Sequence, residues 1–226
     1  MLIAGFPAGM WGTNCYVVAT GAGAECVVVD PGQDAAGGVE EVVREHRLKP
    51  VAVLVTHGHV DHMWSVAPVA GTHDATAWIH PRDRHLLADP MAGMSRETAR
   101  MLLGQDLTWA EPDDVRELAD GQTLELAGLT FDVDHTPGHT EGSVVFRTPY
   151  EQQGVSQVMF SGDLLFKGSI GRTDLPGGDH PSILRSLASK VLPLADDVVV
   201  LPGHGDQTSI GRERATNPYL KDLTTP

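Results

Sequence analysis

The amino-acid sequence predicts an α/β protein in which two β-sheets pack face to face and helices cover their outer sides. Short strand-like runs fill the first third of the chain and return in its second half, and both groups lead into a helix-like segment. The chain has 226 residues, of which 41% are hydrophobic, so it can bury a substantial core. Two halves that each run from strands to a helix indicate a layered sandwich.

The first half has predicted strands at 1–6, 15–19 and 26–30, a helix at 37–48 and strands at 51–56 and 76–80. Valine-rich runs such as "CVVVD" and "VAVLVT" are typical of buried strands. Helix-like segments at 64–70, 81–88 and 95–107 form the middle of the chain, where proline and glycine separate them. The second half has predicted strands at 123–126, 129–135, 143–147 and 157–163, a helix at 182–192 and a strand at 197–205.

Charge and hydropathy exclude some classes of partner. The formal net charge is −14, from 30 acidic and 16 basic residues, and no Lys/Arg cluster offers a track for a phosphate backbone, so we expect no nucleic-acid partner. No apolar run approaches the ~20 residues of a membrane span, and the first residues do not resemble a signal peptide. We therefore expect a cytoplasmic protein with no membrane partner, whose oligomeric state the sequence leaves open.

The two cysteines lie in neighbouring strand-like runs, "CYVVA" and "CVVVD", which a turn-like segment joins. If these runs form a hairpin, Ala19 lies opposite Cys26, and Cys15 lies opposite Asp30. The two sulfur atoms are then not cross-strand neighbours. We expect no disulfide bond between them, which agrees with a reducing cytosol.

The stretch "LVTHGHVDHMWS", residues 54–65, places three histidines and an aspartate within six positions after a predicted buried strand. These residues are His57, His59, Asp61 and His62. Ligand sites in α/β folds commonly lie at the C-terminal ends of strands, and both residue types are good ligands for divalent transition metals. In a tight turn, residues two apart can converge on one point and the next pair on a neighbouring point. The spacing therefore predicts ligands for two adjacent ions, and solvated surface histidines are the weaker interpretation.

Three later stretches also place a potential ligand directly after a predicted strand. They are "DHTPGHTEGS" with His139, "VMFSGDLLF" with Asp163 and "VVVLPGHGD" with His204. Glycine, alone or with proline, shapes the turn that presents each ligand. Four ligands rarely satisfy two ions, so these residues complete a candidate dinuclear site. His135 is left out of the metal set, as either a residue that supports a ligand or a partly exposed histidine at a strand end.

This motif series resembles that of the metallo-β-lactamase superfamily, in which HxHxDH is followed by His, Asp and His. The resemblance extends from about Leu2 to about Leu220 and implies a four-layer αβ/βα sandwich, with the site across one edge of the sheets. It also implies two divalent ions, zinc first and iron or manganese as alternatives. By this resemblance one ion is held by His57, His59 and His139, the other by Asp61, His62 and His204, and Asp163 bridges them.

Two segments, "LLFKGSIGRTDLPGGD" and "LPGHGDQTSIGRERATNPYL", resemble the short glyoxalase II group of hydroxyacylglutathione hydrolase-like proteins. Longer members carry a C-terminal helical domain that helps bind glutathione. Only 226 − 204 = 22 residues follow the last predicted ligand, so we expect a single domain over residues 1–226 without that addition. By the resemblance, Arg172 replaces a lysine that binds the glycine carboxylate of glutathione, and Lys167 assists it. Asp174 and Asp206 stand near positions where the longer enzymes have tyrosines, which leaves the identity of the thiol open.

The predicted activity is hydrolysis of thioesters of small hydroxy acids, of the S-lactoylglutathione type. Two divalent ions lower the pKa of a bridging water towards neutrality, and a thiolate with a conjugate-acid pKa near ~8.5 leaves with little acid assistance. Asp61, which binds metal and orients the hydroxide, and the bridging Asp163 are the predicted catalytic residues. The alternatives are a mononuclear-iron persulfide dioxygenase, which also has a "GRTD" segment, and a lactonase or β-lactamase with the same hydroxide chemistry.

Overall fold

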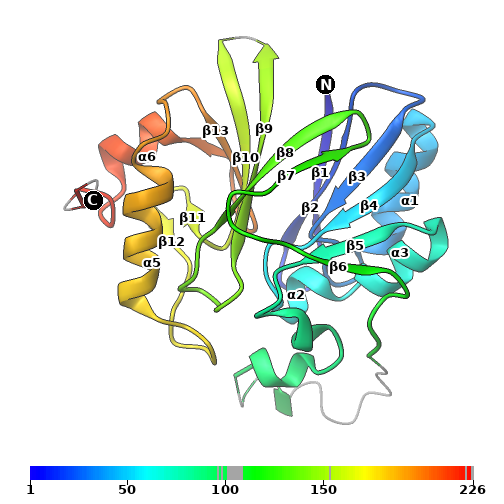
Figure 1. The fold of residues 1–226 in the computed structure, drawn as a ribbon, viewed down its shortest axis with the longest axis horizontal. Helices are drawn as coiled ribbons and strands as arrows, with labels where there is room; N and C mark the ends of the chain where they lie inside the picture. Colours follow the sequence, from blue (N-terminus) through cyan, green and yellow to red (C-terminus); the bar gives the residue numbers. More distant parts are fainter. Residues whose placement is uncertain (96, 98, 101–108, 153, 222, 225–226) are drawn as a thin grey trace.

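The computed structural model has two six-stranded sheets packed together, with helices on both outer sides (Figure 1). It describes residues 1–95, 97, 99–100, 109–152, 154–221 and 223–224. The predicted helix at 95–107 falls largely outside these residues. The layers observed in the described part of the chain confirm the predicted αβ/βα sandwich.

The first sheet begins as an antiparallel meander and continues with parallel strands. Its strands, in spatial order, are β1 (Leu2–Ala8), β2 (Thr13–Ala19), β3 (Glu25–Val29), β4 (Lys49–Leu54), β5 (Thr76–Ile79) and β6 (Val115–Glu117). Neighbours from β3 to β6 are parallel, which requires crossover connections. Helix α1 (Ala35–His46) joins β3 to β4, and the short α2 (Val60–Met63) followed by α3 (Val66–His73) joins β4 to β5.

The second sheet is mainly antiparallel. Its spatial order is β14 (Thr208–Ser209), β13 (Val199–Pro202), β10 (Val155–Gly162), β9 (Val144–Gln152), β8 (Leu129–His135) and β7 (Thr123–Leu126). Only β10 and β13 pair in parallel, and the connection between them contains α5 (His180–Ser186) and one π-helical turn, η3 (Leu187–Val191). A small hairpin of β11 (Leu165–Phe166) and β12 (Ser169–Ile170) follows β10, and α6 (Ile210–Thr216) follows β14.

Most predicted elements are present, with shifted ends. The predicted helix at 81–88 is only a 3₁₀ turn, η1 (Arg84–Leu87), and a second turn, η2 (Pro90–Gly93), follows it. Strands β6, β11, β12 and β14 were not predicted, because each has only two or three residues and no hydrophobic alternation can be recognised over so short a length.

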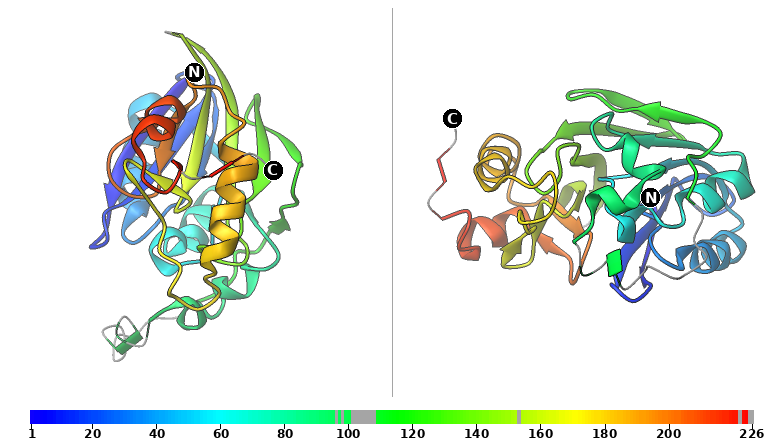
Figure 2. Two further views of the ribbon diagram at one scale, coloured as in Figure 1. Left: turned by 90° about the vertical axis from the view of Figure 1, so that its left-hand side faces the viewer. Right: turned by 90° about the horizontal axis from the view of Figure 1, so that it is seen from below.

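Three clusters of buried side chains hold the layers together. The cluster between the sheets contains Leu54 from the first sheet and Phe131, Phe146 and Phe160 from the second. A second cluster joins the first sheet to α1 and α3, and a third joins the second sheet to α5 and α6. The view from below in Figure 2 shows the helices on opposite sides of the paired sheets. Because both faces of each sheet are covered, the strand ends remain as the place for a site.

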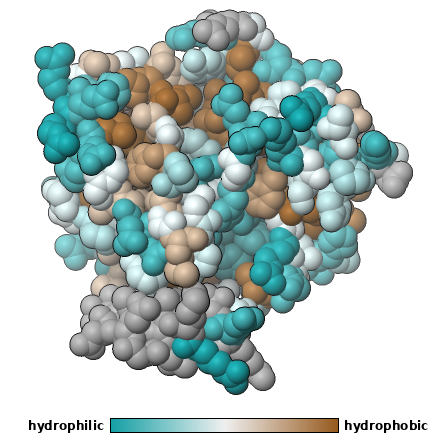
Figure 3. Space-filling view, turned by 180° about the vertical axis from the view of Figure 1, so that it is seen from behind, coloured by the Kyte–Doolittle hydropathy of each residue, from teal (hydrophilic) through white to brown (hydrophobic). Residues whose placement is uncertain are grey.

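The strands β2 and β3 pair in the predicted register, with Ala19 opposite Cys26. Cys15 and Cys26 are both buried and free, as expected. Within the described part of the chain, no helix is long and apolar enough to cross a membrane. The face shown in Figure 3 is mainly hydrophilic, with hydrophobic residues gathered in its upper part.

Candidate metal centre

The structure brings all seven predicted ligands together at the ends of four strands. The 57–62 segment follows β4, His139 follows β8, Asp163 follows β10 and His204 follows β13. The two sheets are also joined directly at this point, because the backbone N–H of Asn14 donates to the carbonyl of Gly203 over 2.7 Å. Strands from both sheets therefore end around one small volume.

Potential ligand atoms approach one another closely there. The distance from His59 Nδ1 to His139 Nε2 is 2.8 Å, and that from His62 Nε2 to His204 Nε2 is 3.3 Å. Three overlapping groups have ligand atoms within 4.8 Å of one another: His57, His59 and His139; His57, His62 and Asp163; and Asp61, His62 and His204. The first and third groups are the two ligand sets that the sequence resemblance implied. The middle group contains the implied bridging residue.

The carboxylate of Asp163 lies between these two sets. Its Oδ1 atom is 3.2 Å from His62 Nε2, and its Oδ2 atom is 3.4 Å from His139 Nε2. Although Oδ1 is close to the His62 ring, it accepts no aligned hydrogen bond from any described residue, and neither does the buried His57 Nε2. A buried polar atom without a partner costs about 1–3 kcal/mol. Divalent cations bound at these atoms would satisfy them, so the residues present fit such ions.

Hydrogen bonds set which nitrogen three of the histidines turn towards the centre. His62 Nδ1–H donates to Asp30 Oδ2 over 2.9 Å, and His139 Nδ1–H donates to the Arg172 carbonyl over 2.7 Å. His57 Nδ1 is 3.1 Å from the hydroxyl of Thr56, which itself donates to Asp30 and can therefore accept from His57. With each Nδ1 occupied as a donor, the Nε2 lone pair remains for a metal ion.

Burial and neighbouring charges shift the pKa values of the ligands in different directions. Burial lowers the pKa of His57, and it lowers the pKa of His59 to about 3, because a charged imidazolium is costly to bury. For His62, burial acts in the same direction, but the carboxylates around it, first that of Asp163, raise its pKa well above the ordinary value. Burial alone would raise the pKa of the Asp163 carboxyl, but His62, His139 and His204 together lower it. The carboxylates thus favour a positive charge at the centre, while burial keeps His57 and His59 as neutral nitrogen ligands.

Two buried aspartates that the sequence analysis did not single out hold this arrangement. Asp30, at the end of β3, accepts from the backbone N–H of Thr56 over 2.8 Å and from its hydroxyl over 2.6 Å, in addition to the bond from His62. Asp30 also has a left-handed backbone, with φ of 49°. Such a conformation persists in a non-glycine residue only where its surroundings fix it. The position of Asp30 at the end of "CVVVD" was the signal that could have identified it.

Asp83 connects the two main ligand loops. One of its oxygens accepts from the backbone N–H of Gly58 over 2.8 Å and from the hydroxyl of Thr140 over 2.6 Å. The other oxygen accepts from the backbone N–H of Gly142 over 2.7 Å. Its side chain is buried, so these charge-assisted bonds form away from water. No sequence signal marks Asp83, because its partners come from loops 25 and 59 positions away.

Two glycines allow the ligand loops to approach one another. Gly162 has φ of 47°, and a Cβ atom there would collide with the side chain of Thr56, so glycine is needed in the turn that presents Asp163. A Cβ atom at Gly203 would collide with the Asp163 carboxylate and with the His62 ring. Glycine at these positions is therefore a requirement of the ligand geometry.

A cavity of about 430 Å³ opens beside the ligands. Five ligands line it: His59, Asp61, His139, Asp163 and His204. The rest of the described lining is largely apolar and includes Trp11, Val60, Met94, Phe166, Ile170 and Leu175. Arg172 also lines this cavity, so the predicted substrate-binding arginine lies at its mouth. Lys167 lines an adjoining cavity of about 630 Å³, which shares His204 and Phe166 with the first.

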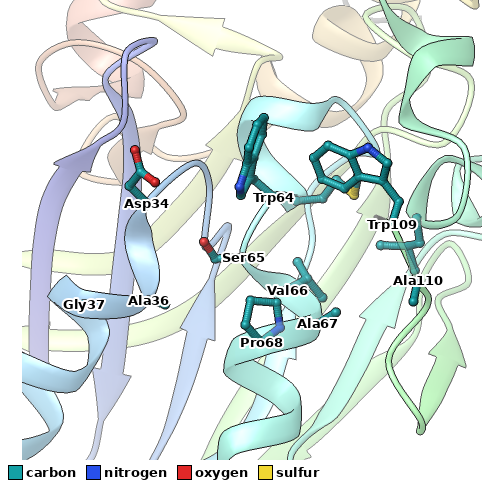
Figure 4. A pocket seen from close by; sticks show the side chains of 12 residues that line it. Asp34, Ala36, Gly37, Trp64, Ser65, Val66, Ala67, Pro68, Trp109 and Ala110 are labelled. Atoms are coloured by element: carbon teal, nitrogen blue, oxygen red, sulfur yellow. The ribbon is translucent and has the colours of Figure 1, made fainter. Parts of the chain in front are cut away.

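A separate cavity of about 450 Å³ lies between the N-terminal ends of α1 and α3 (Figure 4). Its lining includes the rings of Trp64 and Trp109, whose centroids are 4.8 Å apart in an edge-to-face arrangement. None of the seven ligands is among the described residues that line it. The cavity that the ligands line is therefore the candidate active site.

His135 stays outside the ligand groups found among the described residues. Its ring stacks on that of His80, with centroids 4.1 Å apart and an angle of 6° between the planes. Its Nε2–H donates to the carbonyl of Glu141 over 2.9 Å. His135 therefore contacts the loop that carries His139, but it offers nothing to the metal centre directly.

Comparison with known proteins agrees with this geometry. Residues 8–204 match the family model of the metallo-beta-lactamase superfamily. The chain belongs to this superfamily. An uncharacterized protein of Mycobacterium tuberculosis is 47% identical over 99% of this chain and 100% of its own length. Hydroxyacylglutathione hydrolase GloC of Haemophilus influenzae is 32% identical over 85% of this chain and 86% of its own length.

Solved structures show the same fold. The crystal structure of BLEG-1 B3 metallo-beta-lactamase is similar with a TM-score of 0.83 and 40% identity, and 97% of this chain and 99% of the other are covered. The crystal structure of TTHA1623 in a di-iron-bound form gives a TM-score of 0.76 and 37% identity, over 97% of this chain and 100% of the other. Together with the His/Asp cluster, these relationships support a metal-dependent hydrolase that binds divalent ions.

Proposed function

We propose that the protein hydrolyses thioesters of small hydroxy acids with two divalent metal ions, as the short glyoxalase II group does. The observation that carries this proposal is the pair of ligand sets on either side of the Asp163 carboxylate. The similarity to a hydroxyacylglutathione hydrolase over most of both chains supports the choice of a thioester as substrate. The cavity beside the ligands can accommodate a small acyl group against its apolar wall.

When bound, divalent ions at this site supply Lewis-acid polarisation of a carbonyl and lower the pKa of water. Two aspartates contribute directly as catalytic residues. Asp163 presents one oxygen to each ligand set and so fixes their separation. Asp61 Oδ2 accepts from the Thr13 hydroxyl over 3.1 Å and lies 3.1 Å from His204 Nε2. Asp61 is therefore held in place to accept a proton from water and orient it towards the substrate carbonyl.

The departing group requires little from the protein. A thiol has a pKa near ~8.5, so its thiolate leaves from a tetrahedral intermediate without a strong general acid. Arg172 and Lys167 would contact the thiol portion at the mouth of the cavity. Zinc is the proposed metal, since the donors are imidazole and carboxylate, and iron is the main alternative, because TTHA1623 binds two irons.

Metal analysis combined with two assays tests this proposal. Protein purified without added metal should contain close to two ions per chain and should hydrolyse the lactoyl thioester of a small thiol. A chelator should remove this activity, and zinc or iron should restore it. One iron per chain, together with oxygen uptake on a persulfide and no thioester hydrolysis, would instead establish the dioxygenase alternative.

Hydrolysis of β-lactams is a second candidate function, which the similarity to BLEG-1 B3 metallo-beta-lactamase favours. The same ligand sets would serve attack on a lactam carbonyl. A comparison of kcat/KM for a lactoyl thioester and for a chromogenic cephalosporin separates the two. We expect the thioester to be the better substrate by at least ~100-fold, because a thiolate is a far better leaving group than an amine.

A further inference from the structure

Two cations lie near the ligands, Arg172 in the ligand cavity and Lys167 in the adjoining one, and each is already bound to an aspartate. The Nε and Nη2 donors of Arg172 both reach the carboxylate of Asp174, each over 2.7 Å, in a bidentate pair. Lys167 Nζ donates to Asp206 Oδ2 over 2.6 Å. Each pair carries no net charge, so the mouth presents two neutral ion pairs in place of two free cations.

These internal carboxylates compete with any carboxylate on a substrate. Asp174 is two positions from Arg172 on the same loop, so its effective concentration at the guanidinium is in the millimolar range or above, as for any short tether. A substrate carboxylate would have to displace it or lie beside its negative charge. The side chains of Asp174 and Asp206 are 67% and 75% exposed, so their charges are accessible from solvent beside the bound cations.

The donors that remain fit uncharged acceptors. A guanidinium has five N–H groups, and two are used by Asp174, which leaves 5 − 2 = 3 for other partners. A carbonyl or hydroxyl oxygen on the thiol portion can accept from them without a countercharge. Beyond the mouth, the apolar lining from Phe166, Ile170 and Leu175 offers packing surface for an uncharged chain.

We propose that Asp174 and Asp206 determine substrate specificity by closing Arg172 and Lys167 to carboxylates, so that the enzyme selects thioesters of uncharged thiols. This inference rests on the proposed thioester hydrolysis. It gives a role to the two aspartates. By the sequence resemblance, both stand near positions where the longer enzymes have tyrosines. It also changes the expected role of Arg172, from a binder of the glutathione carboxylate to a donor for neutral oxygens.

A third cation near the site, Arg212, is the alternative binding partner for an anionic substrate. It is exposed, lines the adjoining cavity with Lys167, and has no ion-pair partner among the residues that the structure describes. If the enzyme preferred an anionic thiol, the guanidinium of Arg212 would be the cation that binds it in place of Arg172. The experiment must include a variant at this position.

The test uses two lactoyl thioesters that differ by a single carboxylate, those of N-acetylcysteamine and of N-acetylcysteine. For the wild-type enzyme we expect kcat/KM to be about tenfold higher for the uncharged thioester. Asp174→Asn should raise kcat/KM for the anionic thioester by about tenfold, mainly through KM, and change that of the uncharged one by less than about twofold. Asp206→Asn should act in the same direction with a smaller effect. Added salt should reduce the gain, because the new contact is electrostatic and exposed.

Asp34→Asn is the matched control, since it removes the same charge from an exposed aspartate that lines the separate tryptophan-lined cavity. It should leave the preference between the thioesters unchanged. Equal or better hydrolysis of the anionic thioester by the wild type would overturn the specificity inference while upholding the proposed function, and so would an unchanged preference in Asp174→Asn. A wild-type preference for the anion that disappears in Arg212→Ala would overturn it as well. Failure to hydrolyse either thioester would overturn the proposed function itself.

Discussion

The floor of the candidate cavity is formed by the metal ligands, and its mouth by the pairs of Arg172 with Asp174 and of Lys167 with Asp206. Both regions consist of charged and polar side chains, but they differ in exposure to solvent. On the floor, polar ligands are buried: His59 and His139, which line the cavity, are 5% and 2% exposed. At the mouth, the Asp174 and Asp206 side chains are 67% and 75% exposed and paired with Arg172 and Lys167. Buried polar groups must be satisfied in a single geometry, whereas exposed ion pairs contribute little to folding stability. The reaction geometry is therefore fixed, while recognition can change with few substitutions.

The difference extends to how each region is supported. Floor residues are held by buried aspartates, Asp30 and Asp83, each of which accepts three hydrogen bonds from the ligand segments or the residues beside them. The mouth pairs have no such support among the described contacts. Substitutions on the floor and substitutions at the mouth should therefore differ sharply in their effect on activity, on metal content and on stability.

The largest effect is expected for the floor ligands. Asp163→Ala and His59→Ala should each abolish thioester hydrolysis, because each removes a group that holds an ion in place. Metal content per chain should fall as well, while far-UV circular dichroism and the cooperativity of thermal unfolding stay close to wild type. Retention of more than about a tenth of the activity by either variant would contradict the assignment of that residue as a ligand.

A smaller loss of activity is expected for Asp83, which contacts the ligand loops but is not itself a predicted ligand. In Asp83→Asn, an amide nitrogen replaces one carboxylate oxygen and faces an N–H or O–H donor, so at least one of the bonds to Gly58, Thr140 and Gly142 is lost. Changes behind a metal ligand typically cost about 10–100-fold in metal affinity or activity. We expect a loss of kcat/KM in this range, accompanied by weaker metal binding in a competitive chelator titration.

The nearby Asp89→Asn is the control for this substitution, since Asp89 is exposed and makes no side-chain cap bond. It should behave as the wild type in both measurements. If Asp83→Asn lowers the unfolding temperature but leaves metal affinity intact, Asp83 stabilises the fold and does not position the ligand loops.

The contrast between floor and mouth also explains which features the sequence could predict. Each ligand directly follows a hydrophobic strand and a turn, so a local pattern marks His57, His139, Asp163 and His204. The supporting Asp83 has no such mark, because its role arises only when residues 58 and 142 are folded against it. The pairing of Arg172 with Asp174 was missed for another reason: two residues two positions apart can face together or apart in a loop, and the composition does not decide which.

The fold shows the same division. Long valine-rich strands such as β2 and β4 were predictable because buried strands need continuous apolar runs. Edge strands β6 and β14 have three and two residues, and they exist only because a neighbouring strand supplies the hydrogen bonds. Local propensity has no information about such partners.

A still smaller effect is expected at His135. His135→Ala should retain most of the activity, because the described contacts of its ring are with the Glu141 carbonyl and with the ring of His80. Glu141 lies on the loop that carries His139, His80 follows β5, and neither belongs to the ligand groups found among the described residues. Steady-state kinetics and metal content should both stay within about a few-fold of wild type. A loss as complete as that of Asp163→Ala would show that the ligand set had been chosen wrongly.

The smallest effect is expected on the unfolding temperature of the protein when an ion pair at the mouth is broken. Asp174→Asn and Asp206→Asn each break an exposed ion pair, and such pairs contribute little to folding because water and salt screen them. We expect differential scanning fluorimetry to place their unfolding temperatures within about 4 °C of wild type, whereas Asp83→Asn, which disturbs buried bonds, should lower it by more. A large drop for Asp174→Asn would mean that its pair with Arg172 holds the loop whose backbone carbonyl accepts from His139. The mouth would then be part of the floor's support, and changes in substrate preference at Asp174 could no longer be separated from changes in ligand geometry.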